Sequence, residues 1–382
     1  MTHPSRQVCI ATGQNLANLI PAIQLQAAHV TILETPDMTR SARNLKTALE
    51  SRGIEAARIV FDDATPETIR RSAEKAALDL GEAPLVLNVS GGHKLITLAL
   101  TSEMQALAGE NLHLLYCETR YDRLDWLHPA PATEPMESVL RLEDILLAQG
   151  YRIRSRCDRD VRWTTELQSR SSLTFRLGDG AEKLASFFGT LNGLADDALN
   201  EPNGPFRPQQ DLPFTPGGRN ADLLRQAQDL ELLHWDNETE VVFRSEAAAR
   251  YFRGGWLEEY AWLKLRGLGS DDLAAGLEIE SVAEKTVNEL DVVAVHRNRL
   301  LVIECKTGRL GRDGGRDADY IYKLAQLTRQ VGGLMARGLM LSARPASEGL
   351  RFRAMANQVD VLAGREVAAL RRDCERWMAG AA

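Results

Sequence analysis

Short apolar runs alternate with stretches of helical periodicity over the first 128 residues. The runs predict strands at 8–11, 30–33, 58–61, 85–89 and 112–117. The stretches between them predict helices near 15–27, 38–52, 66–80 and 94–108. Such alternation is typical of a parallel sheet covered by helices on both faces. A turn at 120–122 before the run 123–127 predicts a hairpin at the end of this sheet.

The middle of the chain is less regular. A proline-rich linker leads to a helix expected near 134–148 and then to alternating arginines over 152–156, a pattern typical of a strand with one basic face. Helical patterns at 181–199 and 219–233 precede a hairpin signal over 232–244. Two helices followed by a hairpin predict a small winged-helix-like module.

From about residue 250 a helix, two strands, a loop rich in Gly, Arg and Asp, a helix and a strand follow in order. The chain is therefore expected to be an α/β protein with three parts. These are a Rossmann-like domain with a parallel sheet over 1–145, a helix-hairpin linker module over 146–248, and an α/β domain over 249–382. A length of 382 residues also suggests two or three domains.

Composition narrows the class of protein. Apolar residues are 44% and charged residues 26%, which excludes a disordered chain, a collagen-like fibre and a small disulfide scaffold. The net charge of −7 means that any nucleic-acid surface must be a local basic patch. The scattered cysteines lack metal-binding spacing, so we expect reduced thiols in a cytoplasmic protein. With no run of about 18 apolar residues, no membrane association is expected.

The strongest chemical signal lies in two strands expected at 288–295 and 300–306. If they form a hairpin, Asp291 and Glu304 face each other at about 4.5–5.5 Å between Cβ atoms. Lys306 is two residues further on and shares their face. This arrangement places two carboxylates and an ammonium group side by side.

Two close carboxylates are costly unless a cation neutralises them, and Mg²⁺ or Mn²⁺ does so with oxygen ligands. A lysine beside the metal could orient water or stabilise a phosphate. The set therefore indicates metal-assisted phosphodiester hydrolysis. Cys305 points to the other face. The alternative is a surface hairpin in which Glu289 pairs with Lys306.

Two features outside the hairpin favour the catalytic interpretation. The upstream helix places Glu258 on its apolar, core-facing stripe, where a carboxylate needs a metal or a hydrogen-bond partner; Glu259 is the second choice. The segment 297–337 holds nine Lys or Arg against four Asp or Glu, a net +5 that suits a phosphate backbone. The helix after the hairpin is expected to bury Ile321, Leu324, Val331 and Leu334.

A helix glutamate, an aspartate and a Glu-x-Lys hairpin resemble the PD-(D/E)xK nuclease superfamily over about 250–345. The sequence has Leu290-Asp291 in place of the literal Pro-Asp, a common departure. The resemblance implies a catalytic set of Glu258, Asp291, Glu304 and Lys306. It implies Mn²⁺ or Mg²⁺ as the cofactor, with metal ligands from Asp291, Glu304, Cys305 and Glu258.

The N-terminal sheet has two strand ends rich in small and polar residues. They are Thr12, Gly13, Gln14 and Asn15 after the first strand, and Ser90, Gly91, Gly92, His93 and Lys94 after the fourth. Ligands of open parallel sheets bind beyond these ends, and glycines before a helix suit a phosphate. The GxGxxG and GxxxxGK[ST] fingerprints are absent, which excludes a dinucleotide reductase and a P-loop enzyme. The alternative to a ligand site, for each loop taken alone, is that its small and polar residues simply form an ordinary turn.

Together the two loops resemble the CARF domain, a sensor of cyclic oligoadenylates, over about 1–145. CARF joined to a PD-(D/E)xK domain is similar to ancillary nucleases of type III CRISPR defence. The resemblance implies a homodimer that binds cyclic tetra-adenylate across paired CARF domains and then nicks or degrades DNA and/or RNA. The alternatives are a restriction-type endonuclease without a small ligand and a non-enzymatic DNA-binding regulator. The hinge between sensor and nuclease is expected at 152–156 and in the helix-hairpin module.

Overall fold

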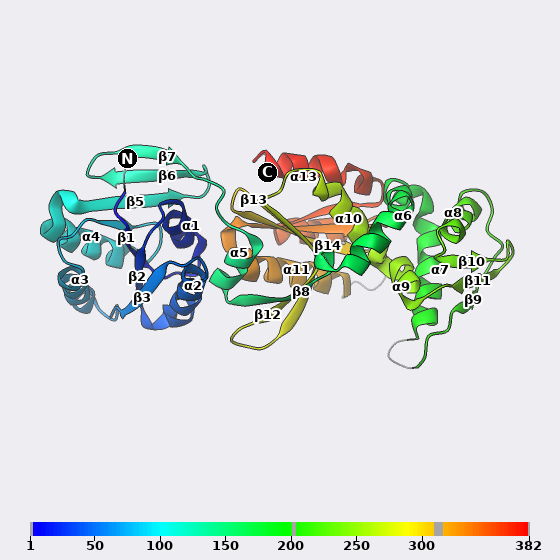
Figure 1. Cartoon of the computed structure of the whole chain (residues 1–382), viewed down its shortest axis with the longest axis horizontal. Helices are drawn as coiled ribbons and strands as arrows, with labels where there is room; N and C mark the ends of the chain where they lie inside the picture. Colours follow the sequence, from blue (N-terminus) through cyan, green and yellow to red (C-terminus); the bar gives the residue numbers. More distant parts are fainter. Residues whose placement is uncertain (1–2, 201–203, 309–315, 381–382) are drawn as a thin grey trace.

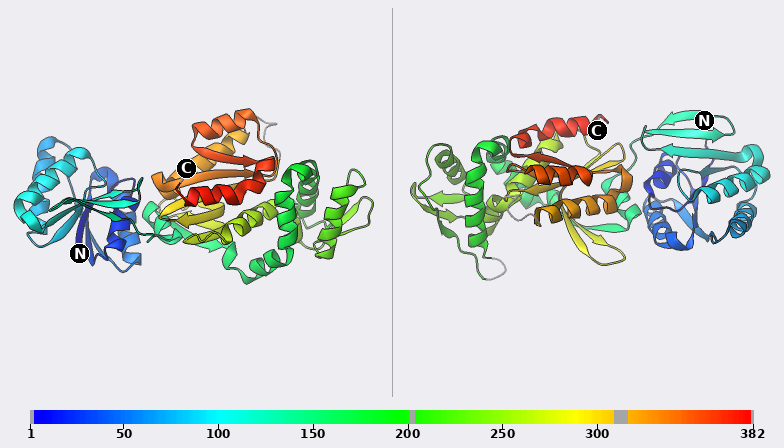
Figure 2. Two further views of the ribbon diagram at one scale, coloured as in Figure 1. Left: turned by 90° about the horizontal axis from the view of Figure 1, so that it is seen from above. Right: turned by 180° about the vertical axis from the view of Figure 1, so that it is seen from behind.

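The structure, a computed structural model, describes residues 3–200, 204–308 and 316–380. They form an elongated molecule in three parts (Figures 1 and 2). The N-terminal domain lies at one end, the C-terminal sheet in the middle, and the module from the middle of the sequence at the opposite end. The N-terminal and C-terminal domains therefore contact each other directly, and the helix-hairpin module does not lie between them as expected. No helix among the described residues is both long and apolar enough to cross a membrane.

The N-terminal domain has the predicted parallel sheet, in the order β3-β2-β1-β4-β5. Its strands are β1 (Arg6–Ile10), β2 (His29–Glu34), β3 (Glu55–Val60), β4 (Leu85–Asn88) and β5 (Leu112–Glu118). The helices are α1 (Leu16–Gln24), α2 (Thr39–Ser51), α3 (Pro66–Leu80) and α4 (Lys94–Ala108). The helices α1 and α2 pack in one core and α3 and α4 in another, so both faces are covered. The predicted hairpin adds antiparallel β6 (Arg123–His128), followed by β7 (Ala132–Pro135).

The helix expected near 134–148 begins only at Leu142, because β7 occupies the start of that range; it is α5 (Leu142–Gln149). The arginine-rich strand follows as β8 (Tyr151–Arg156). It pairs antiparallel with β12 (Asp272–Ser281) and forms the edge of the C-terminal sheet. The C-terminal sheet therefore begins at residue 151, and a boundary at 249 would divide it.

The middle module contains one helix that the sequence pattern missed, α6 (Val161–Asp179). Its buried face includes the polar residues Arg170 and Thr174, which hide its apolar periodicity. The helices α7 (Ala181–Leu199) and α8 (Gly218–Asp229) match the prediction. The predicted hairpin, β10 (Leu233–Trp235) and β11 (Glu240–Phe243), is joined by β9 (Gln209–Asp211) in a three-stranded sheet.

The C-terminal domain is a six-stranded mixed sheet in the order β16-β15-β14-β13-β12-β8. Its other strands are β13 (Val287–His296), β14 (Arg299–Lys306), β15 (Ala336–Ser342) and β16 (Val359–Ala363). The helices are α9 (Glu246–Arg250), α10 (Trp256–Arg266), α11 (Arg316–Gly332), α12 (Glu348–Ala356) and α13 (Leu370–Met378). The core with α10 contains Val292 and Ile303, and the core with α11 contains Val293 and Val302, so these helices cover opposite faces.

Asn298, at the tip of the β13–β14 hairpin, fastens the C-terminal domain to the linker before α5. Its side-chain oxygen accepts hydrogen bonds from the main-chain N–H groups of Val139 (2.9 Å) and Leu140 (3.0 Å), and its amide donates to the Glu137 carbonyl (2.7 Å). Asn298 is buried and has φ +63°, a conformation that asparagine tolerates well. The hairpin is therefore held at the end opposite to Lys306.

Candidate functional site

The β13–β14 hairpin has the predicted register. Val295 pairs with Leu300 and Val292 with Ile303, so Asp291 comes opposite Glu304. The ammonium Nζ of Lys306 lies 2.5 Å from Oε1 of Glu304, which places both side chains on one face. The structure therefore brings together the two carboxylates and the lysine that the sequence singled out.

The regular pairing of β12 with β13 is interrupted beside Asp291. Ala275 pairs with Val292 and packs on the α10 side of the sheet, whereas Leu277 pairs with Leu290 and packs on the α11 side. Gly276 stands between them with φ +51°, and a Cβ atom there would lie 2.4 Å from Sγ of Cys157. In both strands, the alternation of side chains between the two faces of the sheet is therefore interrupted at the row that carries Asp291. A strict two-residue alternation along the sequence does not predict this interruption.

The helix α10 presents its two adjacent glutamates to different surroundings. Glu259 is only 2% exposed and accepts hydrogen bonds from Nε (3.1 Å) and Nη2 (2.5 Å) of Arg170 in α6. Thr174 donates a further one at 3.3 Å. Glu259 therefore joins α10 to α6. Glu258 is half-buried and interacts electrostatically with the carboxylates of the hairpin.

Crowding of carboxylates dominates the electrostatics of the site. Burial, and then the charges of Asp291 and Glu289, raise the pKa of Glu258 well above its usual value. Burial and the charge of Glu304 raise the pKa of Asp291. Burial alone would lower the pKa of Lys306, but the charge of Glu304 and the hydrogen bond to it raise that pKa. The ammonium form of Lys306 is therefore stabilised. Glu258 and Asp291, in contrast, have too little positive charge around them to offset the cost of their own charges.

Cys305 supports Asp291 through its main chain. Its N–H donates a 2.7 Å hydrogen bond to Oδ2 of Asp291 and so fixes that carboxylate. The thiol is buried in the core on the α10 side, and burial raises its pKa well above the usual value. The nearby charges of Asp291 and Glu258 raise the pKa of the thiol further, so its neutral form is favoured. The assignment of Cys305 to the metal ligands stays a prediction.

The carboxylate set fits a hydrated divalent cation. The charge of Asp291 raises the pKa of Glu258, and the charge of Glu304 raises the pKa of Asp291. A cation among these hard oxygen donors would relieve the repulsion. Within the described ranges no group of three His, Cys, Asp or Glu side chains is placed so that it could hold a metal ion by itself. Mg²⁺ needs fewer protein ligands than that, because one or two carboxylates bind the ion and several waters remain.

Thr307, which the sequence analysis did not single out, joins three elements beside Lys306. Its buried hydroxyl lies 3.0 Å from the carbonyl oxygen of Arg253, just before α10, and 2.8 Å from the side-chain amide of Asn192 in α7. This hydroxyl group therefore links the end of β14 to the turn that precedes the Glu258 helix. Only its place directly after the Glu-x-Lys motif could have drawn attention to it.

The loops after β1 and β4 lie side by side, because these strands are neighbours at the point where the strand order reverses. A Cβ atom on Gly91 would come within 2.6 Å of the Thr12 side chain. Gly92 has φ +102°, and a Cβ atom there would lie 2.8 Å from the Ile10 side chain. The two loops thus form one continuous surface, and their close approach requires glycine at positions 91 and 92. Its exposed members are Gly13, Gln14, Gly92, His93 and Lys94.

Two residues of the predicted ligand loops serve the fold instead. Asn15 is 1% exposed and donates hydrogen bonds to the carbonyls of Ser41 (2.8 Å) and Ala148 (3.1 Å). Ser90 accepts a 2.6 Å hydrogen bond from the Cys117 N–H and also bonds to the Asn88 side chain. Asn15 and Ser90 therefore shape the loops from behind. Their exposed neighbours are the loop residues that a ligand could reach.

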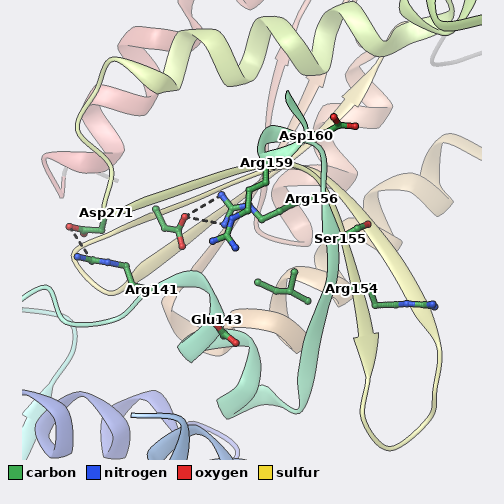
Figure 3. Close-up of a pocket in the computed structure, with 10 residues that line it drawn as sticks. Arg141, Glu143, Arg154, Ser155, Arg156, Arg159, Asp160 and Asp271 are labelled. Carbon is green, nitrogen blue, oxygen red and sulfur yellow. Dashed lines mark hydrogen bonds and ion pairs between the residues drawn. The ribbon is translucent and has the colours of Figure 1, made fainter. Parts of the chain in front are cut away.

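The arginine-rich edge strand borders a cavity of about 820 Å³ between α5, β8 and the start of β12 (Figure 3). Arg156 is ion-paired with Asp158 (2.8 Å) and Asp272 (3.4 Å), and Arg141 faces Asp271 at 3.8 Å. Acidic groups therefore balance much of the positive charge here. The cavity contains none of the hairpin carboxylates, so it is separate from the candidate catalytic site.

Comparison with known proteins agrees with this geometry. Residues 245–381 match the family model of the Card1-like endonuclease domain. The C-terminal part of the chain is thus an endonuclease-type domain, as the hairpin chemistry predicted. Comparison with curated proteins finds no match.

Three solved structures share the fold. Can2 from Sulfobacillus thermosulfidooxidans, in complex with cyclic tetra-adenylate, aligns with a TM-score of 0.79 and 23% identity over 98% of this chain and 97% of that one. Protein VC1899 from Vibrio cholerae aligns with a TM-score of 0.84 and 22% identity over 98% of both chains. A type III CRISPR defence DNA nuclease activated by cyclic oligoadenylate aligns with a TM-score of 0.53 and 19% identity, over 91% of this chain and 48% of that one. The predicted union of a Rossmann-like domain with a nuclease-type domain is confirmed at the level of fold.

Thr307 provides a prediction about catalytic geometry. Thr307→Val removes the hydroxyl and should lower nuclease activity about 10- to 100-fold, because small displacements of catalytic groups are costly. Thr307→Ser keeps the hydroxyl and should retain most activity. Initial cleavage rates, measured over a range of Mn²⁺ concentrations, test both variants.

Thr328→Val is the matched control, since Thr328 is equally buried but its hydroxyl has no hydrogen-bond partner among the described residues. It should cleave like the parent. Equal activity of Thr307→Val and Thr328→Val would contradict the positioning role.

Proposed function

We propose that this protein is a metal-dependent nuclease of type III CRISPR defence that cyclic tetra-adenylate activates. The observation that carries the proposal is the Asp291, Glu304 and Lys306 cluster on one hairpin of a Card1-like endonuclease domain. The sensor half of the proposal rests on the paired loops of the N-terminal sheet and on the full-length likeness to Can2 bound to cyclic tetra-adenylate. The substrate is DNA and/or RNA.

The catalytic roles follow from the contacts of each side chain. Asp291 and Glu304 would hold a hydrated Mn²⁺ or Mg²⁺ ion, with Glu258 at the edge of the set; the ion supplies charge neutralisation and an activated water. The Cys305 N–H keeps the Asp291 carboxylate in one orientation. Lys306, held by Glu304, presents its ammonium to the phosphate and stabilises negative charge that develops there.

The ligand half of the mechanism uses main-chain groups and one cation. Thr12, Gly13 and Gln14 form one wall, and Gly91, Gly92 and His93 form the other. Lys94 begins α4, whose N-terminus favours an anion. A cyclic oligonucleotide carries repeated phosphates, so a two-fold arrangement of two such surfaces suits it.

Exposed leucines support a homodimer through the N-terminal domain. Leu95 and Leu98 of α4 are 47% and 67% exposed, directly after the loop that carries Lys94. A second copy that covers these leucines would bring two ligand loops together. The proposed dimer interface therefore lies on α4.

The first test is loss of the metal site. Glu304→Ala should lower cleavage of single- and double-stranded DNA and RNA by at least about 100-fold, because charge stabilisation at the phosphate is lost. Titration calorimetry should show unchanged binding of cyclic tetra-adenylate. EDTA should abolish cleavage by the parent. Glu348→Ala, at an exposed carboxylate on α12, is the control and should remain active. Full cleavage by Glu304→Ala would reject the assignment.

The second test separates ligand affinity from chemistry. Lys94→Ala removes a positive charge from the ligand surface and should raise the ligand concentration for half-maximal cleavage roughly 10-fold, with the same rate at saturation. The measurement is a titration of cleavage with cyclic tetra-adenylate. Lys75→Ala, at an exposed lysine on α3, is the control. An unshifted midpoint, or ligand-independent cleavage by the parent, would favour a restriction-type endonuclease.

The third test concerns assembly. Leu98→Glu places a charge on the proposed interface and should give a monomer in light scattering at micromolar concentration. Leu78→Glu is the matched control, because Leu78 is also 67% exposed but lies on α3. It should remain dimeric. A parent that is monomeric with ligand present would refute the interface.

A further inference from the structure

The ligand loop of the N-terminal domain touches the C-terminal domain through one side chain. Oε1 of Gln14 accepts a 3.0 Å hydrogen bond from the main-chain N–H of Leu334. The preceding residue, Gly333, has φ +59°, and a Cβ atom there would lie 2.4 Å from the same oxygen. The approach of Gln14 to this turn therefore requires glycine at position 333.

Leu334 itself differs from the expected buried residue of α11. Ile321, Leu324 and Val331 are buried as predicted, but Leu334 is 85% exposed because the helix has already ended at Gly332. Leu334 lies in the short turn Gly333–Met335 that connects α11 to β15. The part of Leu334 that makes a contact is its main-chain N–H group, which points at Gln14.

Both elements that leave this turn run to the candidate catalytic site. The helix α11 has 17 residues, about 25 Å in length. Near its other end, the Tyr320 ring lies 5.1 Å from Nζ of Lys306. The strand β15 pairs with β14 residue by residue, from Ala336 beside Leu300 to Ser342 beside Lys306. A displacement of the turn would therefore reach Lys306 along two routes.

We propose that the contact between Gln14 and Leu334 is a latch through which the ligand loop holds the nuclease domain in its inactive arrangement. The proposal rests on the proposed function, because it describes regulation of the same site. Gln14 has a single amide oxygen directed at Leu334, so a ligand that recruits this side chain must compete with the latch. Ligand binding then weakens the latched arrangement, and the latched arrangement weakens ligand binding. An activating ligand shifts the population towards the unlatched arrangement.

The latch can be broken without altering a ligand-loop residue. Gly333→Ala introduces a methyl group against the Gln14 oxygen. It should raise ligand-free cleavage about 2- to 10-fold, the range expected for one hydrogen bond, and lower the ligand concentration for half-maximal cleavage by a similar factor. Gln14→Leu removes the acceptor from the other side and should raise ligand-free cleavage to the same extent.

Gly269→Ala is the matched control. Gly269 lies in the same domain with φ +78°, so alanine meets the same kind of backbone strain, but no atom lies within 4 Å of the added methyl group. It should leave both quantities unchanged. Equal behaviour of Gly333→Ala and Gly269→Ala, together with parental ligand-free cleavage by Gln14→Leu, would overturn the latch.

Hydrogen–deuterium exchange of the Leu334 amide supplies a readout that does not depend on cleavage. Cyclic tetra-adenylate should accelerate exchange at this amide in the parent, and Gln14→Leu should accelerate it without ligand. Accelerated exchange in a parent that never cleaves nucleic acid would support the latch and reject the nuclease assignment. Ligand-activated cleavage with unchanged exchange at Leu334 would reject the latch and leave the nuclease assignment intact.

Discussion

The mutual repulsion of carboxylates at one row of the C-terminal sheet is the constraint on which the rest of the structure depends. Burial raises the pKa values of Glu258 and Asp291, so the fold must supply positive charge and hydrogen bonds around them. Lys306 and the Cys305 N–H provide part of this support. The remaining imbalance is what makes the row suitable for a divalent cation, and a site fully neutralised by protein groups would have little affinity for one.

The sequence predicted the hairpin well because its register depends on a local turn and on an alternating pattern. Asp291, Glu304 and Lys306 lie where that register requires. The assignment of Glu258 stays a prediction, and the reason expected for it was wrong, since Glu259 is the fully buried residue and Arg170 neutralises it. That pairing joins positions 89 residues apart, and no local pattern contains such information.

Non-local packing explains the features that the sequence did not reveal. The helix α6 was missed because its buried face carries Arg170 and Thr174, and β8 was assigned to a linker because its partner strand is β12. Thr307 and Gly276 have ordinary local sequences, and their roles arise only from Asn192, Arg253 and Cys157 in other elements. The helix-hairpin module was placed between the two domains for the same reason, because order along the chain does not give position in the molecule.

Two of the contacts that the N-terminal half makes with the catalytic domain lie at the same end of its sheet. Asn298 fixes the tip of the β13–β14 hairpin, and Gln14 contacts the turn before β15. The strands β14 and β15 pair from Leu300 beside Ala336 at this end to Lys306 beside Ser342 at the other. The first attachment comes from the linker and the second from the ligand loop, so the second can respond directly to a ligand. A fixed point beside a movable one at the same end allows small shifts of the turn to become changes in orientation at Lys306.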